Sequence, residues 1–146
     1  MPDQRTIERA EEDAREGKSA STQAGEFVRE EIHHVREGKH GASSPQQAIA
    51  IGLSKARRAG IKLGVPKQSS ASVRAKAAED EEASHHKSRK PSRKRSLATE
   101  RALKREPRNT VTSRKLSQQA KRSSARRGKT ARSQAATKAA RTRKAA

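Results

Sequence analysis

The residues best suited to chemistry lie at positions 26–41, in the run EFVREEIHHVREGKHG. Glu30 with His33, and Glu31 with His34, have the Glu-x-x-His spacing found in carboxylate-bridged di-iron bundles. Such a site needs the same motif on another helix and two further glutamates, and no second predicted helix carries it. We therefore predict no metal and no cofactor, and we interpret these histidines as part of a solvated helix surface.

Periodicity supports that interpretation. Val28, Ile32 and Val35 recur at helical spacing and form an apolar face, which leaves Glu30 and His33 toward the polar side. Elsewhere in the chain, no GxSxG motif and no Ser-x-x-Lys motif with partner residues marks a nucleophile. We predict no catalytic residues and a protein that is not an enzyme.

The loop GKHGASS at residues 38–44 resembles a phosphate-binding turn, because two glycines and a lysine precede a helix start. It is not a P-loop, since the GxxxxGK[ST] order and a preceding strand are absent. It is either a helix stop with a turn and a cap, or a place where Lys39, His40 and free backbone N–H groups contact a phosphate. The last turn of the next helix adds three candidate cations, Lys55, Arg57 and Arg58. They complement the helix dipole, extend a basic patch, or do both.

Composition indicates an anionic partner. The chain has 146 residues, with 36 Lys and Arg against 16 Asp and Glu and a formal charge of +20. Such a charge is typical of proteins that bind nucleic acid and, less often, acidic membranes or polyphosphate. No cysteine is present, which excludes disulfides and thiolate metal sites. Only 29% of residues are hydrophobic and many are alanine, so we predict that part of the chain is disordered or conditionally folded.

The charge is concentrated in the second half. Residues 1–66 carry 11 basic and 10 acidic residues, a net charge of +1, whereas residues 67–146 carry 25 and 6, a net charge of +19. Nearly all large apolar residues lie in the first half. We predict four regions: a charged helix at 1–18, a helical hairpin core at 19–66, a linker with an acidic knot at 67–86, and a Lys/Arg-rich tail at 87–146.

Two helices are predicted before residue 40. The first covers residues 3–16, where acids and arginines alternate at spacings that permit ion pairs, and it stops at Gly17. The second begins after an N-cap at Ser21 or Thr22 and stops at Gly38. The first helix has little apolar content, so it would be marginal alone and could complete the core of the hairpin.

The third predicted helix has the strongest signals. Ser44 is its N-cap, Pro45 occupies its first position, and Gly60 ends it. With the second helix it would form an antiparallel hairpin in which Gly52 and Ala56 allow close approach. The predicted interface places one apolar set against another: Phe27, Val28, Ile32 and Val35 against Ile49, Leu53 and Ala56, with Ile61 and Leu63 at one end.

The tail from residue 87 has 22 basic and 2 acidic residues. Helix propensity is high in RSLATERALKRE and SRKLSQQAKRSSARR, yet large apolar side chains are few, so we predict disorder or helices stabilised by phosphate. Tyr and Trp are absent, which disfavours base stacking on single strands and leaves phosphate contacts on duplex DNA or structured RNA. We assign these contacts to Lys87, Arg89, Lys90, Arg93, Lys94, Arg95, Lys104, Arg105, Arg114, Lys115, Lys121, Arg122, Arg126, Arg127, Lys129, Arg141, Arg143 and Lys144.

The segment STQAGEFVREEIHHVREGKHGASSPQQAIAIGLSKARRAGIKL resembles an uncharacterised family of small basic bacterial proteins. Their shared core has the form GEFVREEI-HVREGKHG-QAIAIGLSKARRAG, and Lys/Arg-rich tails follow it. The resemblance covers residues 19–63 closely and the tail loosely. It implies a bacterial protein of a family described as DNA-binding, with no assigned active site to carry over. The tail is also similar in composition to the basic arms of histone-H1-like proteins.

Together these features predict an all-α, non-enzymatic, nucleoid-associated protein whose tail binds nucleic acid largely without reading its sequence, with duplex DNA favoured over RNA. The alternative is an adaptor whose hairpin binds a protein partner while its tail anchors it to RNA, a ribosome or a DNA-repair complex. A second copy or another protein would bind through residues 19–63. No signal peptide or membrane span is recognisable, so we predict a cytoplasmic location at the nucleoid.

Overall fold

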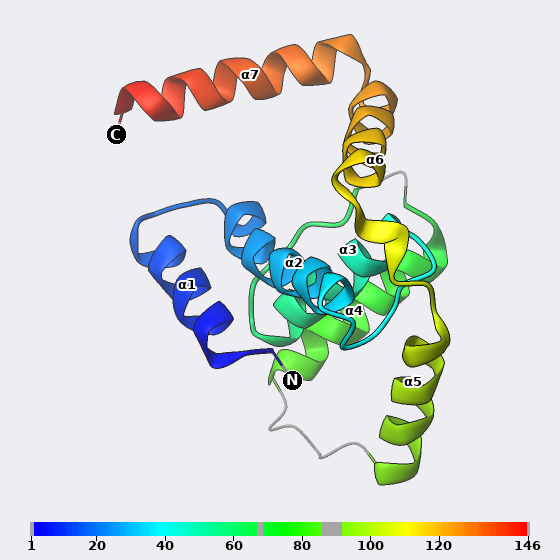
Figure 1. The fold of residues 1–146 in the computed structure, drawn as a ribbon. Helices are drawn as coiled ribbons and strands as arrows, with labels where there is room; N and C mark the ends of the chain where they lie inside the picture. The colour runs from blue at the N-terminus through cyan, green and yellow to red at the C-terminus, as the bar shows by residue number, and fades with distance from the viewer. Residues whose placement is uncertain (1, 67–68, 86–91, 146) are drawn as a thin grey trace. The chain divides into compact units, whose positions relative to one another are not determined.

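A computed structural model of the protein describes residues 2–66, 69–85 and 92–145, and within these ranges it is all helical, without a strand (Figure 1). The chain divides into two compact units, Met1–Val111 and Thr112–Ala146. The described helices are α1 (Gln4–Arg15), α2 (Ala20–Arg36), α3 (Pro45–Arg58), α4 (Ala71–His85), α5 (Arg93–Arg105), the short 3-10 helix η1 (Asn109–Val111), α6 (Ser113–Arg126) and α7 (Gly128–Ala145).

Local signals set the ends of α1 and α2. Gly17 (φ 71°) and Gly38 (φ 75°) adopt the left-handed conformation that ends each helix, as predicted. The predicted N-cap of α2 was wrong. Ser19 is the cap, and its hydroxyl accepts from the backbone N–H of Thr22 at 3.4 Å. The helix therefore begins earlier than expected, and one of the two proposed caps is the donor.

The predicted ends of α3 are confirmed. The Ser44 hydroxyl accepts from the backbone N–H of Gln47 at 3.2 Å, and Pro45 takes the first helical position. At the other end Gly60 has a φ of 94°, and the N–H of Ile61 donates to the carbonyl of Ala56 at 3.1 Å. This is the Schellman pattern.

Helices α2 and α3 form the predicted antiparallel hairpin. Val35 near the end of α2 packs in one cluster with Ala48 near the start of α3, and Phe27 packs in the other with Ala56. Between them, a Cβ at Gly52 would lie 2.7 Å from the Cα of Val28, so only glycine fits this crossing. The predicted close approach of the two helices at Gly52 is confirmed.

One predicted interface residue was misplaced. Ala48 is fully buried, whereas Ile49, expected at the interface, is only partly buried and lies outside both apolar clusters. The buried face of α3 is the run of small residues Ala48, Gly52 and Ala56. Small residues let the helix axes approach closely, so the contact follows this row and not the row of larger side chains.

Two apolar clusters stabilise the first unit. The first contains Ala10, Ala24, Phe27 and Ala56, with Ile7, Leu53, Ile61 and Leu63 packed against it. Since Ala10 and Ile7 come from α1, the first helix does complete the core of the hairpin. The second contains Val35, Ala42, Ala48 and Val111, with Ile32 beside it. Val111 comes from the region predicted to be a tail.

The docking segment, residues 103–111, holds the α2–α3 loop. The backbone N–H of Gly41 donates to the carbonyl of Leu103, and that of Ala42 to the carbonyl of Pro107, both at 2.9 Å. The Thr110 hydroxyl donates to the Ala42 carbonyl at 2.8 Å across 68 residues of sequence. Val111 is fully buried. The first unit therefore extends well beyond the predicted boundary at residue 66.

Of the two states predicted for the C-terminal half, disorder is corrected by the structure, because the described residues there are largely helical. Residues 71–85, expected within a linker, form α4 and pack against α3, and α5, α6 and α7 cover most of the predicted tail. Two causes were underestimated: alanine-rich sequence has high helix propensity, and the segment that ends at Val111 is anchored by tertiary contacts.

We expect Gly41→Ala to destabilise the first unit by about 1–3 kcal/mol, the usual cost of overpacking. A Cβ at Gly41 would fall on the backbone carbonyl of Glu106, so the docking segment would have to move. Urea denaturation followed by circular dichroism measures the effect. The control, Gly25→Ala, adds a Cβ to an exposed helical position with no atom within 4 Å and should stabilise α2 by about 0.5–1 kcal/mol. Equal stability of Gly41→Ala and wild type would contradict the docking.

Candidate functional site

The second unit consists of two helices rich in basic residues. Thr112 caps α6, and its hydroxyl accepts from the backbone N–H of Lys115 at 3.4 Å. Gly128, with a φ of 74°, separates α6 from α7. Residues 112–146 contain 12 Lys and Arg and no Asp or Glu. No carboxylate side chain within this unit can therefore neutralise its cations.

Most cations predicted to contact nucleic acid in this unit are exposed. Lys115 is partly buried, and the other nine lie in solvent: Arg114, Lys121, Arg122, Arg126, Arg127, Lys129, Arg141, Arg143 and Lys144. Arg132 and Lys138 are also exposed on α7, although the prediction omitted them. Both lie in the same run without acidic residues as the predicted contacts, and this shared composition could have identified them from sequence.

The remaining predicted contacts precede the second unit. Five lie exposed on α5: Arg93, Lys94, Arg95, Lys104 and Arg105. Lys104 pairs with Glu100 at 2.6 Å, so part of this charge is already neutralised. The other three, Lys87, Arg89 and Lys90, lie outside the described residues.

Several proposed phosphate contacts of the hairpin have internal partners. The ammonium of Lys55 pairs with Glu30 and Glu31, and the guanidinium of Arg58 pairs with Asp80 at 2.8 Å. Lys39 is exposed and pairs with Glu37 at 3.2 Å. Arg57 is partly buried, and its Nε has no hydrogen-bond partner among the described residues. The structure does not gather these cations into one phosphate-binding patch.

The acidic knot of the predicted linker, residues 79–82, lies in α4 and neutralises part of the charge on the last turn of α3. The carboxylate of Asp80 is buried and accepts hydrogen bonds from Ser54 and Arg58, while Lys76 lies 3.4 Å away. Burial by itself raises the pKa of Asp80, but these hydrogen bonds and positive charges outweigh it, so the pKa lies below its ordinary value. The knot therefore helps to attach α4 to α3.

The interpretation of Glu30, Glu31 and the histidines as a solvated surface is corrected by the structure. Glu30 is 5% exposed and Glu31 1% exposed. Both carboxylates contact Lys55 of α3, and that of Glu31 also contacts His40 in the α2–α3 loop. Of the three histidines at positions 33, 34 and 40, only His33 is exposed, as predicted. Apolar periodicity did not indicate this burial, because polar side chains also face the interior here: α3 presents the long cation Lys55 to this part of α2.

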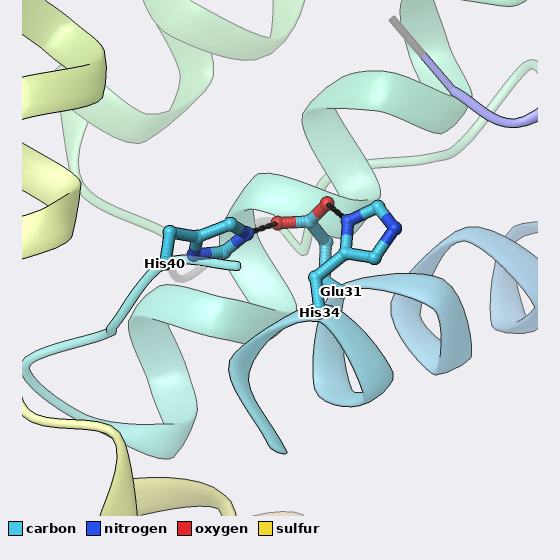
Figure 2. A group of neighbouring side chains, drawn as sticks. All are labelled: Glu31, His34 and His40. Atoms are coloured by element: carbon cyan, nitrogen blue, oxygen red, sulfur yellow. Dashed lines mark ion pairs between the residues drawn. The ribbon is translucent and has the colours of Figure 1, made fainter. Parts of the chain in front are cut away.

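Glu31 lies between two imidazole rings (Figure 2). Its Oε1 is 3.5 Å from Nδ1 of His34, on the same helix, and its Oε2 is 3.3 Å from Nε2 of His40, in the following loop. The two rings are 6.0 Å apart and nearly perpendicular, at 81°. The other nitrogen of His34 faces carboxylate oxygens of Asp3, at 3.5 Å, and Glu30, at 3.9 Å.

Lys55 is the cation at the centre of this cluster. Its Nζ donates to Glu31 and, at 3.2 Å, to Glu30. Burial lowers the pKa of Lys55, but the hydrogen bond to Glu31 and the charges of both glutamates outweigh it, so the pKa is raised. An open cavity of about 190 Å³ lies beside the cluster, and Asp3, Arg5, Glu30 and His34 are among its lining residues.

No helix among the described residues is long and apolar enough to cross a membrane. Comparison of the chain with models of known protein families, with characterised proteins and with solved structures finds no match.

Proposed function

We propose that this protein binds duplex nucleic acid through the phosphate backbone, using α6 and α7, without reading base sequence and without catalysing a reaction. The observation that carries the proposal is the second unit itself, in which exposed helices present 12 cations and no acid. An unpaired charge of this density favours a polyanion as the partner.

The dimensions of α7 support a backbone contact. Its 18 residues span about 27 Å at 1.5 Å per residue, and it carries six of the twelve cations. A DNA duplex carries one negative charge for about every 1.7 Å of its axis. The duplex therefore has ample charge to match one side of this helix, and binding would release counterions.

Base stacking is disfavoured by the fold as well as by composition. Phe27 is the only aromatic residue of the Phe, Tyr and Trp class, and it is fully buried in the first apolar cluster. Proteins that bind single strands without sequence preference stack bases on exposed aromatic rings. Duplex DNA at the nucleoid is therefore the favoured partner, and structured RNA is the second.

The test compares the full chain with a chain that ends at Val111, in binding titrations against random-sequence duplex DNA over a range of salt concentrations. If about 8 phosphates are contacted, the full chain should give a log-log salt slope near −7. The shortened chain, which keeps the buried Val111 and hence the first unit, should bind more than about 100-fold more weakly at low salt. Equal binding by the two chains would refute the assignment to α6 and α7.

A matched pair of variants tests the contacts in the full chain. Replacing Lys138, Arg141 and Arg143 by glutamine should make the slope less steep by about 3, close to 0.9 for each lost contact. The control replaces three exposed cations of the first unit, Arg5, Arg15 and Lys62, and changes the net charge equally. An equal loss in both variants would indicate a general charge effect and no interface on α7.

The adaptor alternative makes a different prediction. Some hairpin side chains that could bind a partner are already packed inside the first unit: Phe27 contacts residues of α1, and Val35 packs with Val111. An adaptor would retain its protein partner after truncation at Val111 and lose only its anchor to nucleic acid. Co-purification of one defined protein with the shortened chain would therefore favour the adaptor.

A further inference from the structure

We propose that Glu31, His34 and His40 form a binding site for one divalent transition-metal ion of the Zn²⁺ class. Each residue offers one ligand atom, and the three atoms lie within 4.8 Å of one another. This site is separate from the basic helices of the second unit and does not depend on the proposed nucleic-acid binding. It also replaces the prediction that these residues hold no metal.

The orientation of the His40 ring favours a cation beside Glu31. Its Nδ1 lies 2.9 Å from the carbonyl oxygen of Gly41, and a carbonyl can only accept, so Nδ1 carries the proton. In a neutral ring, Nε2 then presents its lone pair to the Glu31 carboxylate at 3.3 Å. Two lone pairs facing each other repel. The contact is favourable only when a cation lies between them, either a second proton on the ring or a metal ion.

His34 also has an imidazole nitrogen that faces a carboxylate without a proton between them. Its Nδ1 faces Glu31 at 3.5 Å, and its Nε2 faces Asp3 at 3.5 Å. A neutral imidazole has one N–H and one lone pair, so one of its nitrogens would meet a carboxylate without a proton. If Nδ1 binds a metal ion, the proton of the neutral ring lies on Nε2, which faces the Asp3 carboxylate at 3.5 Å. A slightly shorter contact would be the outer hydrogen bond that metal-bound histidines usually make.

Negative charge is in excess at this cluster, which favours binding of a cation. Two buried carboxylates, those of Glu30 and Glu31, share one ammonium, that of Lys55, and their side chains are 3% and 1% exposed. The carboxylate of Asp3, whose side chain is 61% exposed, lies at the other nitrogen of His34. Lys55 therefore matches one of the two buried negative charges when both histidines are neutral, and a bound cation or a further proton would balance the other. Lys55 would then donate to the glutamates as an outer partner of the metal-bound carboxylate.

Zn²⁺ fits the donor set. It binds imidazole nitrogen at about 2.0–2.1 Å and carboxylate oxygen at about 2.0–2.2 Å, usually with four ligands in a tetrahedron. Tetrahedral ligand atoms at such distances are about 3.4 Å apart. The contacts at 3.5 and 3.3 Å are made by different oxygens of Glu31, Oε1 toward His34 and Oε2 toward His40, and the three ligand atoms lie within 4.8 Å of one another. A small approach of these side chains would bring them to one ion. Three protein ligands leave one position for water or a small anion. The docking segment holds the loop that carries His40, because Leu103 accepts from Gly41 at 2.9 Å.

The test titrates the full-length protein with Zn²⁺ in competition with a chromophoric chelator. We expect one tightly bound Zn²⁺ per chain, and a loss of affinity of more than about 10-fold in His34→Ala and in His40→Ala. His33→Ala is the matched control, because His33 lies on the same helix as His34 but its side chain is exposed. Retained affinity in His40→Ala, or no binding at micromolar Zn²⁺, would overturn the proposal.

A second measurement needs no substitution. In NMR spectra of the wild-type imidazoles, Zn²⁺ should move the signals of His34 and His40 and leave those of His33 in place. Movement confined to His85 and His86 would identify an adventitious ion only. If His34 and His40 each carry two protons at neutral pH and Zn²⁺ does not displace them, protons balance the cluster and the metal site is refuted.

Discussion

Replacing Phe27 by alanine is expected to lower the free energy of unfolding of the first unit by about 3–5 kcal/mol. Phe27 is fully buried, and the buried residues around it, Ala10, Ala24 and Ala56, are all alanines. Alanines are too short to fill the space left by the ring, and the larger side chains packed against the cluster, Ile7, Leu53, Ile61 and Leu63, would have to move to close the cavity. Small domains have about 5–15 kcal/mol of stability in total, so this change alone would remove a large share of it.

Chemical denaturation of the chain that ends at Val111 measures this effect without a contribution from α6 and α7. The control is Leu97→Ala, which removes a large apolar side chain that is 41% exposed and should change stability by no more than about 0.5 kcal/mol. A cost below about 1 kcal/mol for Phe27→Ala would mean that the ring is not the centre of the core.

Lys55→Met is expected to destabilise the first unit by about 3 kcal/mol, because it leaves Glu30 and Glu31 buried without their cation. The value lies at the low end for a buried pair because the Lys55 side chain is still 22% exposed. The measurement is urea denaturation at neutral pH, with a chelator present so that no metal ion compensates. The control is Lys39→Met, an exposed lysine with an exposed partner, for which at most about 0.5 kcal/mol is expected.

The pH dependence provides a second check on Lys55. Its pKa in the folded protein is raised above the ordinary value of 10.5, so the folded state binds the proton more tightly than the unfolded state. The contribution of Lys55 to stability is therefore complete below that ordinary value and is lost as pH rises through the folded-state pKa. The stability difference between wild type and Lys55→Met should be constant near neutral pH and shrink in strongly alkaline solution. A difference that grows there would contradict the ion pairs.

Both variants act on the hairpin, whose local features were predictable. Gly38, Ser44 and Gly60 end or begin their helices where the sequence indicated, since left-handed glycines and side-chain caps act within a few residues. Gly52 was recognised as a point of close approach because its spacing from Ala56 places both on one helix face. The candidate interface on α6 and α7 also follows from sequence, because an acid-free run of cations is a property of composition.

The location of Val111 was not predictable in this way. It lies in a region whose composition suggests a tail, yet it is fully buried beside Val35, Ala42 and Ala48. The contact between Thr110 and Ala42 spans 68 residues, and no periodic pattern encodes a partner at that distance. Sequence reasoning therefore ended the folded unit at residue 66, whereas the structure ends it at Val111.

The surroundings of Glu31, His34 and His40 were also not predictable from sequence. The sequence determined their types and placed two of them one turn apart on a helix, and it also determined the charge asymmetry and the helix ends. Only the tertiary structure decided that Glu31 is buried, that Lys55 reaches it from α3, and that the loop brings His40 to its other side. Helix signals act between near neighbours, whereas the environment of a carboxylate depends on which distant segments exclude water from it.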